Sequence, residues 1–246
     1  MIAILPAAKA HKVRRGNFNI DIVFPGLALH NPEDARGLAQ LGRFDFAQLL
    51  PGVFVGMHMH QNDEILSYLR SGTLQHEDSS GEKATLSNRK LMMMNAGSGF
   101  YHQEQIPENG EPVRMLQIFV RPERENETPK VQFHEFDEAF SINQWRLIAG
   151  HKQTNAPLEI RSKVRIFDAR FTKDQTFESP TSETLQLLFV FSGCIELTDG
   201  TLLAEGDSLV FTTARTQFKS TQLTDLVLFE LNENADYIRN GMFSGT

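Results

Sequence analysis

Short runs rich in Val, Ile, Leu and Phe alternate along the chain with turn signals made of glycine, serine and aspartate. Hardly any segment keeps a 3.6-residue hydrophobic period over about a dozen residues, whereas alternation with a period of two recurs. This pattern is typical of β-strands joined by tight turns. We therefore predict a protein that is mainly all-β.

Residues 53–60 show the alternation clearly. Successive side chains of a strand point to opposite faces, and both faces of this segment are mostly apolar, as expected for a barrel wall packed inside and out. The expected faces are Phe54, Gly56, His58 and His60 on one side and Val53, Val55, Met57 and Met59 on the other.

The chain also contains an internal repeat. The repeat consists of two segments whose first residues lie 121 positions apart, Leu66–Gln75 and Leu187–Glu196. Each segment carries Ser-Gly after an apolar run. In both copies a polar turn and a further apolar strand follow. Two copies of one β-barrel unit account for this order.

A charged stretch with two prolines, Arg121–Lys130, separates the copies, and irregular chain is expected to extend to about Pro157. We assign residues 1–130 to an N-terminal barrel and residues 131–246 to a C-terminal barrel. All eight histidines lie at or before His151, in the first barrel or in the irregular chain expected to follow it, so the second barrel has no imidazole to place in its mouth. It is expected to close one side of the first barrel or to form an interface.

Composition narrows the class of protein. The 246 residues are 40% hydrophobic and include 19 Phe, but no apolar run approaches the ~18 residues of a membrane span, and the first residues lack the basic start of a signal peptide. A single cysteine, Cys194, excludes an internal disulfide and fits a buried thiol in a reducing cytoplasm. A net charge of −7 and a pI near 5.6 weigh against direct nucleic-acid binding.

Two short motifs offer candidate metal ligands. His58 and His60 are two residues apart, as are His102 and Glu104, so each pair projects from one face of a strand. The turn signal in residues 96–99 precedes the second pair and would bring it into the barrel. Facing strands would then offer three imidazoles and one carboxylate to one ion.

This donor set suits Fe(II), Mn(II), Ni(II), Cu(II) or Zn(II). Four protein ligands leave two positions free on a six-coordinate ion, as a catalytic site requires.

Other suggestive residues have simpler interpretations. Met92–Met94 fit core packing better than copper ligation, because alternation splits them between two faces. His76 is interpreted as a polar turn residue, with a polar group at the pocket edge as the alternative. The following aromatic residues could form either a pocket wall or barrel core: Phe54, Phe100, Tyr101 and Phe119.

Residues 52–122 resemble the pirin family of the cupin superfamily. Gly52, His58-Met-His60 and Glu64 resemble the first cupin motif, and Gly99-Phe-Tyr-His102 resembles the end of the second. The denser pirin-like segments are 58–69, 71–81, 96–104 and 116–122. The chain departs from the family at Met59, where pirins usually have proline, and at Gln61, where they usually have arginine or lysine.

The resemblance implies two tandem cupin barrels, that is, double-stranded β-helices of the jelly-roll type. It also implies His58, His60, His102 and Glu104 as the metal ligands. Generic cupins often take their carboxylate from the position of Glu64. We favour Glu104, which is held beside His102, and expect Glu64 to orient an imidazole.

Similarity to bacterial pirin-like quercetinases implies a dioxygenase that oxidises a flavonol or similar enol with O2, as quercetin 2,3-dioxygenase does. One divalent ion is then expected, with Fe(II) favoured by the resemblance, and Glu104 would stay bound or accept a proton. The alternative class is a non-enzymatic, metal-dependent regulator that binds a protein partner. A third interpretation is a metal that only stabilises the barrel.

Overall fold

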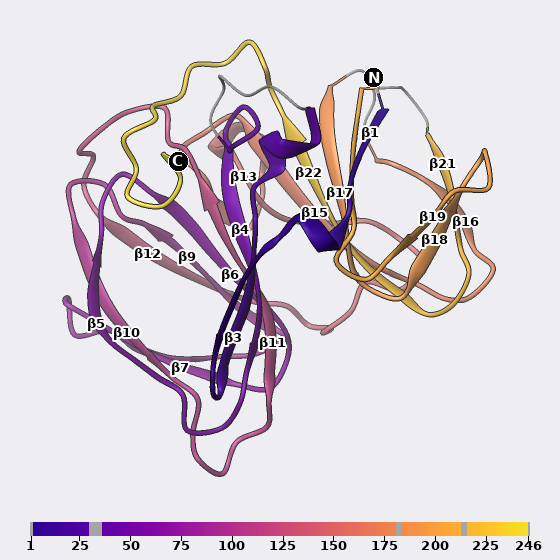
Figure 1. Ribbon diagram of the computed structural model, residues 1–246. Coiled ribbons are helices and arrows are strands. Elements are labelled where there is room, and N and C mark those ends of the chain that lie inside the picture. Colours follow the sequence, from indigo (N-terminus) through magenta and orange to yellow (C-terminus); the bar gives the residue numbers. More distant parts are fainter. Residues whose placement is uncertain (1, 30–35, 181–183, 213–215, 246) are drawn as a thin grey trace.

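The computed structural model describes residues 2–29, 36–180, 184–212 and 216–245. It shows two β-barrels side by side, each built from a seven-stranded and a four-stranded sheet (Figure 1). The helices in the described residues are 3-10 turns at Ala7–Lys9 (η1), Pro25–Leu29 (η2) and Lys152–Thr154 (η3). No described helix has the length and apolar character needed to span a membrane. The predicted all-β fold with two tandem barrels is confirmed.

The first barrel contains the histidine motifs. Its large sheet has the order β12-β9-β6-β11-β4-β3-β2, with bounds Lys130–Glu135, Lys90–Asn95, Glu64–Ser71, Val113–Val120, Leu41–Leu49, Phe18–Val23 and His11–Arg15. Its small sheet has the order β5-β10-β7-β8, with bounds Phe54–His60, Phe100–Gln105, Leu74–Asp78 and Lys83–Leu86. Neighbouring strands pair antiparallel throughout.

The second barrel repeats this arrangement. Its large sheet has the order β1-β20-β17-β22-β15-β13-β14, with bounds Ile2–Leu5, Ser208–Phe211, Leu185–Ser192, Thr224–Leu231, Val164–Phe171, Arg146–Gly150 and Leu158–Glu159. Its small sheet has the order β16-β21-β18-β19, with bounds Thr176–Glu178, Gln217–Ser220, Cys194–Leu197 and Leu202–Ala204. The segments related by the predicted repeat, β6 and β17, occupy the same place in the two sheets.

The two halves of the chain exchange strands. β1 pairs with β20 in the second barrel, at the position that β12 takes beside β9 in the first. The chain therefore contributes its first strand to the second barrel, and it crosses between the large sheets after β12, in residues 136–145. Strand pairing thus divides the protein differently from a single cut in sequence, and the boundary at residue 130 stays a prediction.

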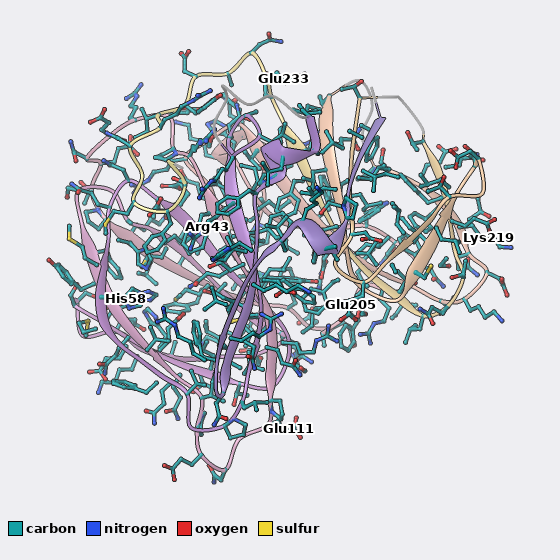
Figure 2. All side chains as sticks on the ribbon, viewed as in Figure 1. Arg43, His58, Glu111, Glu205, Lys219 and Glu233 are labelled. Atoms are coloured by element: carbon teal, nitrogen blue, oxygen red, sulfur yellow. The ribbon has the colours of Figure 1, made fainter. Side chains whose placement is uncertain are left out.

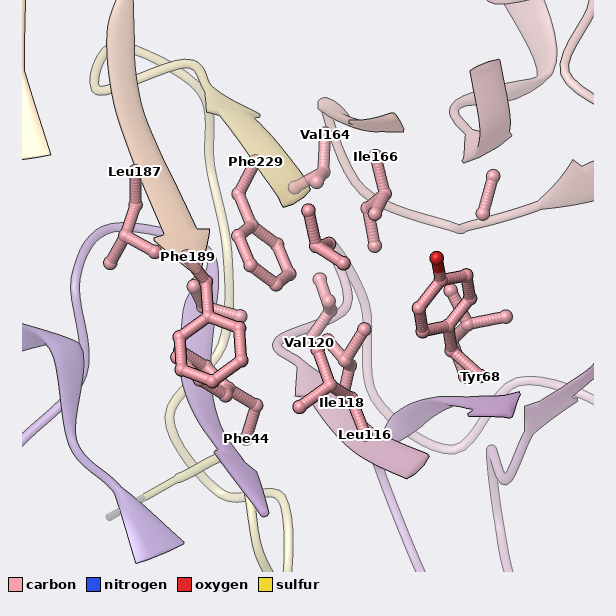
Figure 3. Packing of buried hydrophobic residues seen from close by; sticks show 14 of the residues in the cluster. Phe44, Tyr68, Leu116, Ile118, Val120, Val164, Ile166, Leu187, Phe189 and Phe229 are labelled. Carbon is pink, nitrogen blue, oxygen red and sulfur yellow. The ribbon is translucent and has the colours of Figure 1, made fainter. Parts of the chain in front are cut away.

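The two large sheets pack against each other and share one hydrophobic core (Figure 3). Phe44 from β4 packs against two aromatic rings of the second barrel, with its centroid 5.0 Å from Phe189 and 5.5 Å from Phe229. Met92–Met94 are fully buried and belong to three different clusters, so the prediction of core packing is confirmed. Because burial of aromatic and aliphatic surface is the main stabilising contribution, the barrels support each other.

A buried ionic network crosses the same interface. Arg70 on β6 forms ion pairs with Asp168, at 3.3 Å, and with Asp225. Asp168 also accepts a hydrogen bond from the Tyr68 hydroxyl at 3.0 Å and pairs with Arg146 at 2.8 Å. Arg70 and Asp168 are almost completely shielded from water, so the guanidinium and both carboxylates depend on one another for solvation.

We expect Arg70→Met to destabilise the protein by about 3 kcal/mol, because it leaves buried carboxylates with fewer cationic partners. The measurement is the free energy of unfolding in urea. Lys83→Met is the control, since its ammonium forms an exposed ion pair with Glu77 and its loss should not change stability measurably. Equal stability of the Arg70→Met variant and the wild type would contradict this role for the network.

Candidate metal centre

The register of two strands brings the three predicted histidine ligands together. β5 carries His58 and His60, β10 carries His102, and His58 lies directly opposite His102. Nε2 of His102 is 3.0 Å from Nε2 of His58 and 3.1 Å from Nε2 of His60. All three side chains offer a ligand atom within 4.8 Å of the others. The first barrel thus places three imidazole nitrogens around one point (Figure 2 labels His58).

A β-bulge in β5 sets the direction of these side chains. Opposite β10, His58 pairs with His102, but Val55 rather than Gly56 pairs with Glu104, so β5 contains one extra residue. Val55 therefore lines the same cavity as the histidines, whereas Phe54 is 58% exposed. The predicted placement of Phe54 on the histidine face is wrong, because simple alternation does not continue through a bulge.

The bulge also orients His58. Nδ1 of His58 lies 2.9 Å from the carbonyl oxygen of Gly56, to which it can donate its proton. In that tautomer Nε2 keeps its lone pair and points toward His102. The backbone carbonyl thus acts as a fixed partner for the nitrogen that does not face the centre.

Burial keeps the imidazoles of His58 and His102 in their neutral form. It lowers the pKa of His102 to about 2, and the neighbouring His60 and His58 lower it further. Burial also lowers the pKa of His58, and the hydrogen bond to Gly56 opposes this only partly. Because a metal ion binds the neutral ring, these two side chains are ready to act as ligands at neutral pH.

Glu104 lies beside the histidines in a distinctive state. It lines the same cavity as His58 and His60 and is almost fully buried, and its Oε1 atom has no hydrogen-bond partner among the described residues. Burial raises the pKa of Glu104 to about 7, and the amide of Gln117 acts in the opposite direction.

A buried carboxylate without a partner is costly, and a cation held by the three imidazoles would relieve that cost. Three nitrogens and one oxygen also form a donor set that divalent transition metals accept, so the residues present fit such an ion. Glu104 lies outside the compact histidine group, and its ligation of the metal stays a prediction.

Glu64, the alternative carboxylate, is directed elsewhere. Its Oε2 atom accepts hydrogen bonds from the backbone N–H of Arg161, at 2.8 Å, and from the side chain of Asn95. These bonds connect the first barrel to the segment after β14. The carboxylate beside the ring of His60 is instead Asp63, whose Oδ2 lies 3.8 Å from Nδ1 of His60.

His76 belongs to the site although it was interpreted as a turn residue. It lies within β7, is 2% exposed, and its Nδ1 is 3.4 Å from Nδ1 of His102. Its Nε2 lies 3.2 Å from Oδ2 of Asp78, whose other oxygen accepts hydrogen bonds from Ser80. The turn interpretation is wrong because the strand continues to Asp78. The sequence did hold a signal: His76 and Asp78 form a third pair with a spacing of two.

The structure places the four aromatic residues for which the sequence left two positions open, the pocket wall and the barrel core. Phe119 lines the cavity, Phe100 is buried in the core, and Tyr101 is exposed like Phe54. In the second barrel, Phe177 pairs with Phe218 between β16 and β21, the counterparts of β5 and β10.

These two rings stack with centroids 5.5 Å apart. Aromatic packing therefore fills the region of the second barrel that corresponds to the histidine site.

Asp78 contacts His76, and His76 contacts the ligand His102. Because residues behind the ligands fix the orientation of ligating imidazoles, we expect Asp78→Asn to weaken metal binding by about 10–100-fold. A chromophoric chelator competing for the metal would measure this affinity. Glu77→Gln is a matched control, since Glu77 is the neighbouring carboxylate and points to the outer surface, where it contacts Lys83. An unchanged affinity in Asp78→Asn would show that His102 does not need this support.

Glu64 should make stability depend on pH. Burial raises its pKa from 4.5 to about 7, so the folded state binds the proton more tightly and stability falls as the pH rises through this range. The free energy of unfolding of Glu64→Gln, relative to that of the wild type, should rise by about 3 kcal/mol as the pH increases from about 4 to 8. Urea unfolding across this range, with exposed Glu111→Gln as control, would measure the difference. A difference that does not vary with pH would contradict the burial of an ionisable Glu64.

Comparison with known proteins agrees with this architecture. A family model described as Pirin matches residues 36–120, and one described as Quercetinase C-terminal cupin domain matches residues 147–231. The quercetin 2,3-dioxygenase of Escherichia coli strain K12 is 28% identical over 120 residues. That alignment covers 49% of this chain and 51% of the relative, which is about half of each.

Solved structures extend the likeness to nearly the whole chain. Bacterial pirin YhhW from Escherichia coli, in complex with nickel(II), matches with a TM-score of 0.81 at 21% identity over 94% of this chain and 99% of that one. A quercetin 2,3-dioxygenase from Acinetobacter baumannii matches with a TM-score of 0.71 at 23% identity, over 91% and 84%. With one family model on each barrel, the chain belongs to the pirin family of two-barrel cupin proteins.

Proposed function

We propose that the protein is a metal-dependent dioxygenase that oxidises a flavonol or a similar enol with O2, in the manner of a quercetin 2,3-dioxygenase. The observation that carries the proposal is the convergence of three imidazole Nε2 atoms beside the carboxyl of Glu104, whose buried Oε1 has no hydrogen-bond partner in the part of the chain that the structure describes. Relatives named as quercetin 2,3-dioxygenases support the reaction class.

His58, His60, His102 and Glu104 would hold one divalent ion in this scheme. Fe(II) is the expected metal, and Mn, Ni, Cu and Zn suit the same donors. When bound, such an ion supplies Lewis-acid and redox chemistry for the reaction of an enol with O2. The fold supplies the rest of the site.

The residues of the cavity would prepare the substrate. Phe119 offers a flat apolar wall against which an aromatic ring can lie, and the aliphatic side chains around it limit access of water. Glu104 is a buried carboxyl in the same cavity, and in its ionised form it can accept the proton of an enol hydroxyl. Its proposed catalytic role is therefore that of a general base.

Oxygen consumption tests this function. The protein is loaded anaerobically with Fe(II), its metal content is measured, and O2 uptake is followed with quercetin and other flavonols. We expect uptake that depends on both metal and flavonol, and a loss of at least about 100-fold in Glu104→Gln. Glu77→Gln, the same change on the outer surface, should leave the rate unchanged.

Two results would count against the proposal. Absence of uptake by the fully loaded protein would argue against a dioxygenase and favour a regulator that binds a protein partner. A Glu104→Gln protein with full metal content and full turnover would remove Glu104 as the base.

A further inference from the structure

The cavity that contains the histidines extends to a second polar group on the opposite wall. It has a volume of about 250 Å³ and is bounded by β3, β4, β5, β10 and β11. On β4, Arg43 and Asp45 face into it, and Nη2 of Arg43 donates a hydrogen bond to Oδ2 of Asp45 at 3.0 Å. Figure 2 places Arg43 in the same barrel as His58.

This pair has unused hydrogen-bonding capacity. Asp45 is 5% exposed, yet its Oδ1 atom has no partner among the described residues, and neither has the shielded Nε of Arg43. Buried donors and acceptors are normally satisfied, so an unused donor beside an unused acceptor calls for an explanation. The chemistry proposed above uses neither. A ligand that offers an oxygen acceptor to Arg43 and a hydroxyl to Asp45 would satisfy both.

The remaining wall comes from a distant part of the sequence. Phe243 lies in the 241–245 segment, which crosses the first barrel near the end marked C (Figure 1). Its ring centroid is 4.9 Å from that of His60 and 5.3 Å from that of Phe119. The guanidinium of Arg43 lies 4.8 Å from the same centroid. Phe243 therefore touches both the histidine end and the Arg43 end of the cavity.

Hydrogen bonds hold the 241–245 segment in place. The backbone N–H of Phe243 donates to Asp63 at 3.1 Å, and that of Ser244 donates to the same carboxylate at 2.8 Å. The carbonyl oxygen of Ser244 accepts a hydrogen bond from Nε of Arg121 at 2.8 Å. These hydrogen bonds fix the position of Phe243 in the wall of the cavity.

We propose that Arg43 and Asp45 recognise the polar edge of the substrate and that Phe243 makes the cavity favour one or two rings over three. This inference rests on the proposed function for the reaction at the histidines and narrows its substrate class to small planar hydroxylated enols. The cavity is smaller than the ~300–1,000 Å³ of most ligand pockets. Phe119 and Phe243 provide flat faces for a ring, and the charged pair provides a donor beside an acceptor.

Recognition by the pair is tested with kojic acid and allomaltol, which share a hydroxypyranone head and differ by one distal hydroxyl group. Calorimetric titration is done without O2 on metal-free protein and on protein loaded with redox-inactive Zn(II). We expect about tenfold tighter binding of kojic acid in both forms, as one additional hydrogen bond to a charged group provides.

The variant Arg43→Met/Asp45→Leu replaces the ion pair with apolar side chains of similar size, which proteins often tolerate. It should bind both compounds equally. Gln48→Met, an exposed change on the same strand, should keep the preference. Equal binding of the two compounds by the wild type would overturn recognition by the pair whether or not the double variant folds, and so would a preference that survives in the double variant.

The size limit is tested with maltol, 3-hydroxychromone and 3-hydroxyflavone, which present the same hydroxy-ketone on one, two and three rings. The wild type should bind 3-hydroxyflavone at least about tenfold more weakly than 3-hydroxychromone. Phe243→Ala should remove this gap, and exposed Met242→Ala should keep it. An equal loss of affinity for all three compounds in Phe243→Ala would overturn the size limit, because it would indicate a purely structural role.

Binding and turnover distinguish this inference from the proposed function. The expected affinity ratios without O2 uptake by the Fe(II) protein would support the recognition site and reject the dioxygenase. O2 uptake without these ratios would support the dioxygenase and reject the recognition site.

Discussion

The pairing of β5 with β10 is the constraint on which the candidate site depends. Because His58 stands opposite His102, the imidazoles of two strands meet at one point, and His60 joins them from the next inward position. A shift of this register by one residue would turn a strand's side chains to the other face. The bulge at Gly56 belongs to the same constraint, since its carbonyl fixes the ring of His58.

Local patterns in the sequence predicted much of this arrangement. Alternation predicted the strands, the spacing of two predicted which histidines share a face, and the repeat predicted two similar barrels. Alternation failed at Phe54, where an extra residue in the strand changes the phase, and no local pattern indicates a bulge of this kind. The role of His76 was missed although its spacing from Asp78 resembles that of the other pairs.

Contacts between segments that are distant in the sequence could not be predicted, for a different reason. The exchange of β1 and β12 depends on which sheet edge each strand meets in the folded protein. The contact of Phe243 with His60 joins segments that no periodicity relates, and the hydrogen bonds of Asp63 that create it connect residues 180 positions apart. The two barrels also show how one framework serves two purposes, because stacked Phe177 and Phe218 stand where the first barrel has histidines.

The position of Phe243 has a consequence for biosynthesis. Ribosomes make a protein from its N-terminus, so the histidines and the described strands of both barrels are synthesised before this ring is added. A nascent or prematurely terminated chain that ends before residue 243 would have the three imidazoles but an unfinished pocket wall. Truncation at this point would therefore separate the ion-binding group from the enclosure of the pocket.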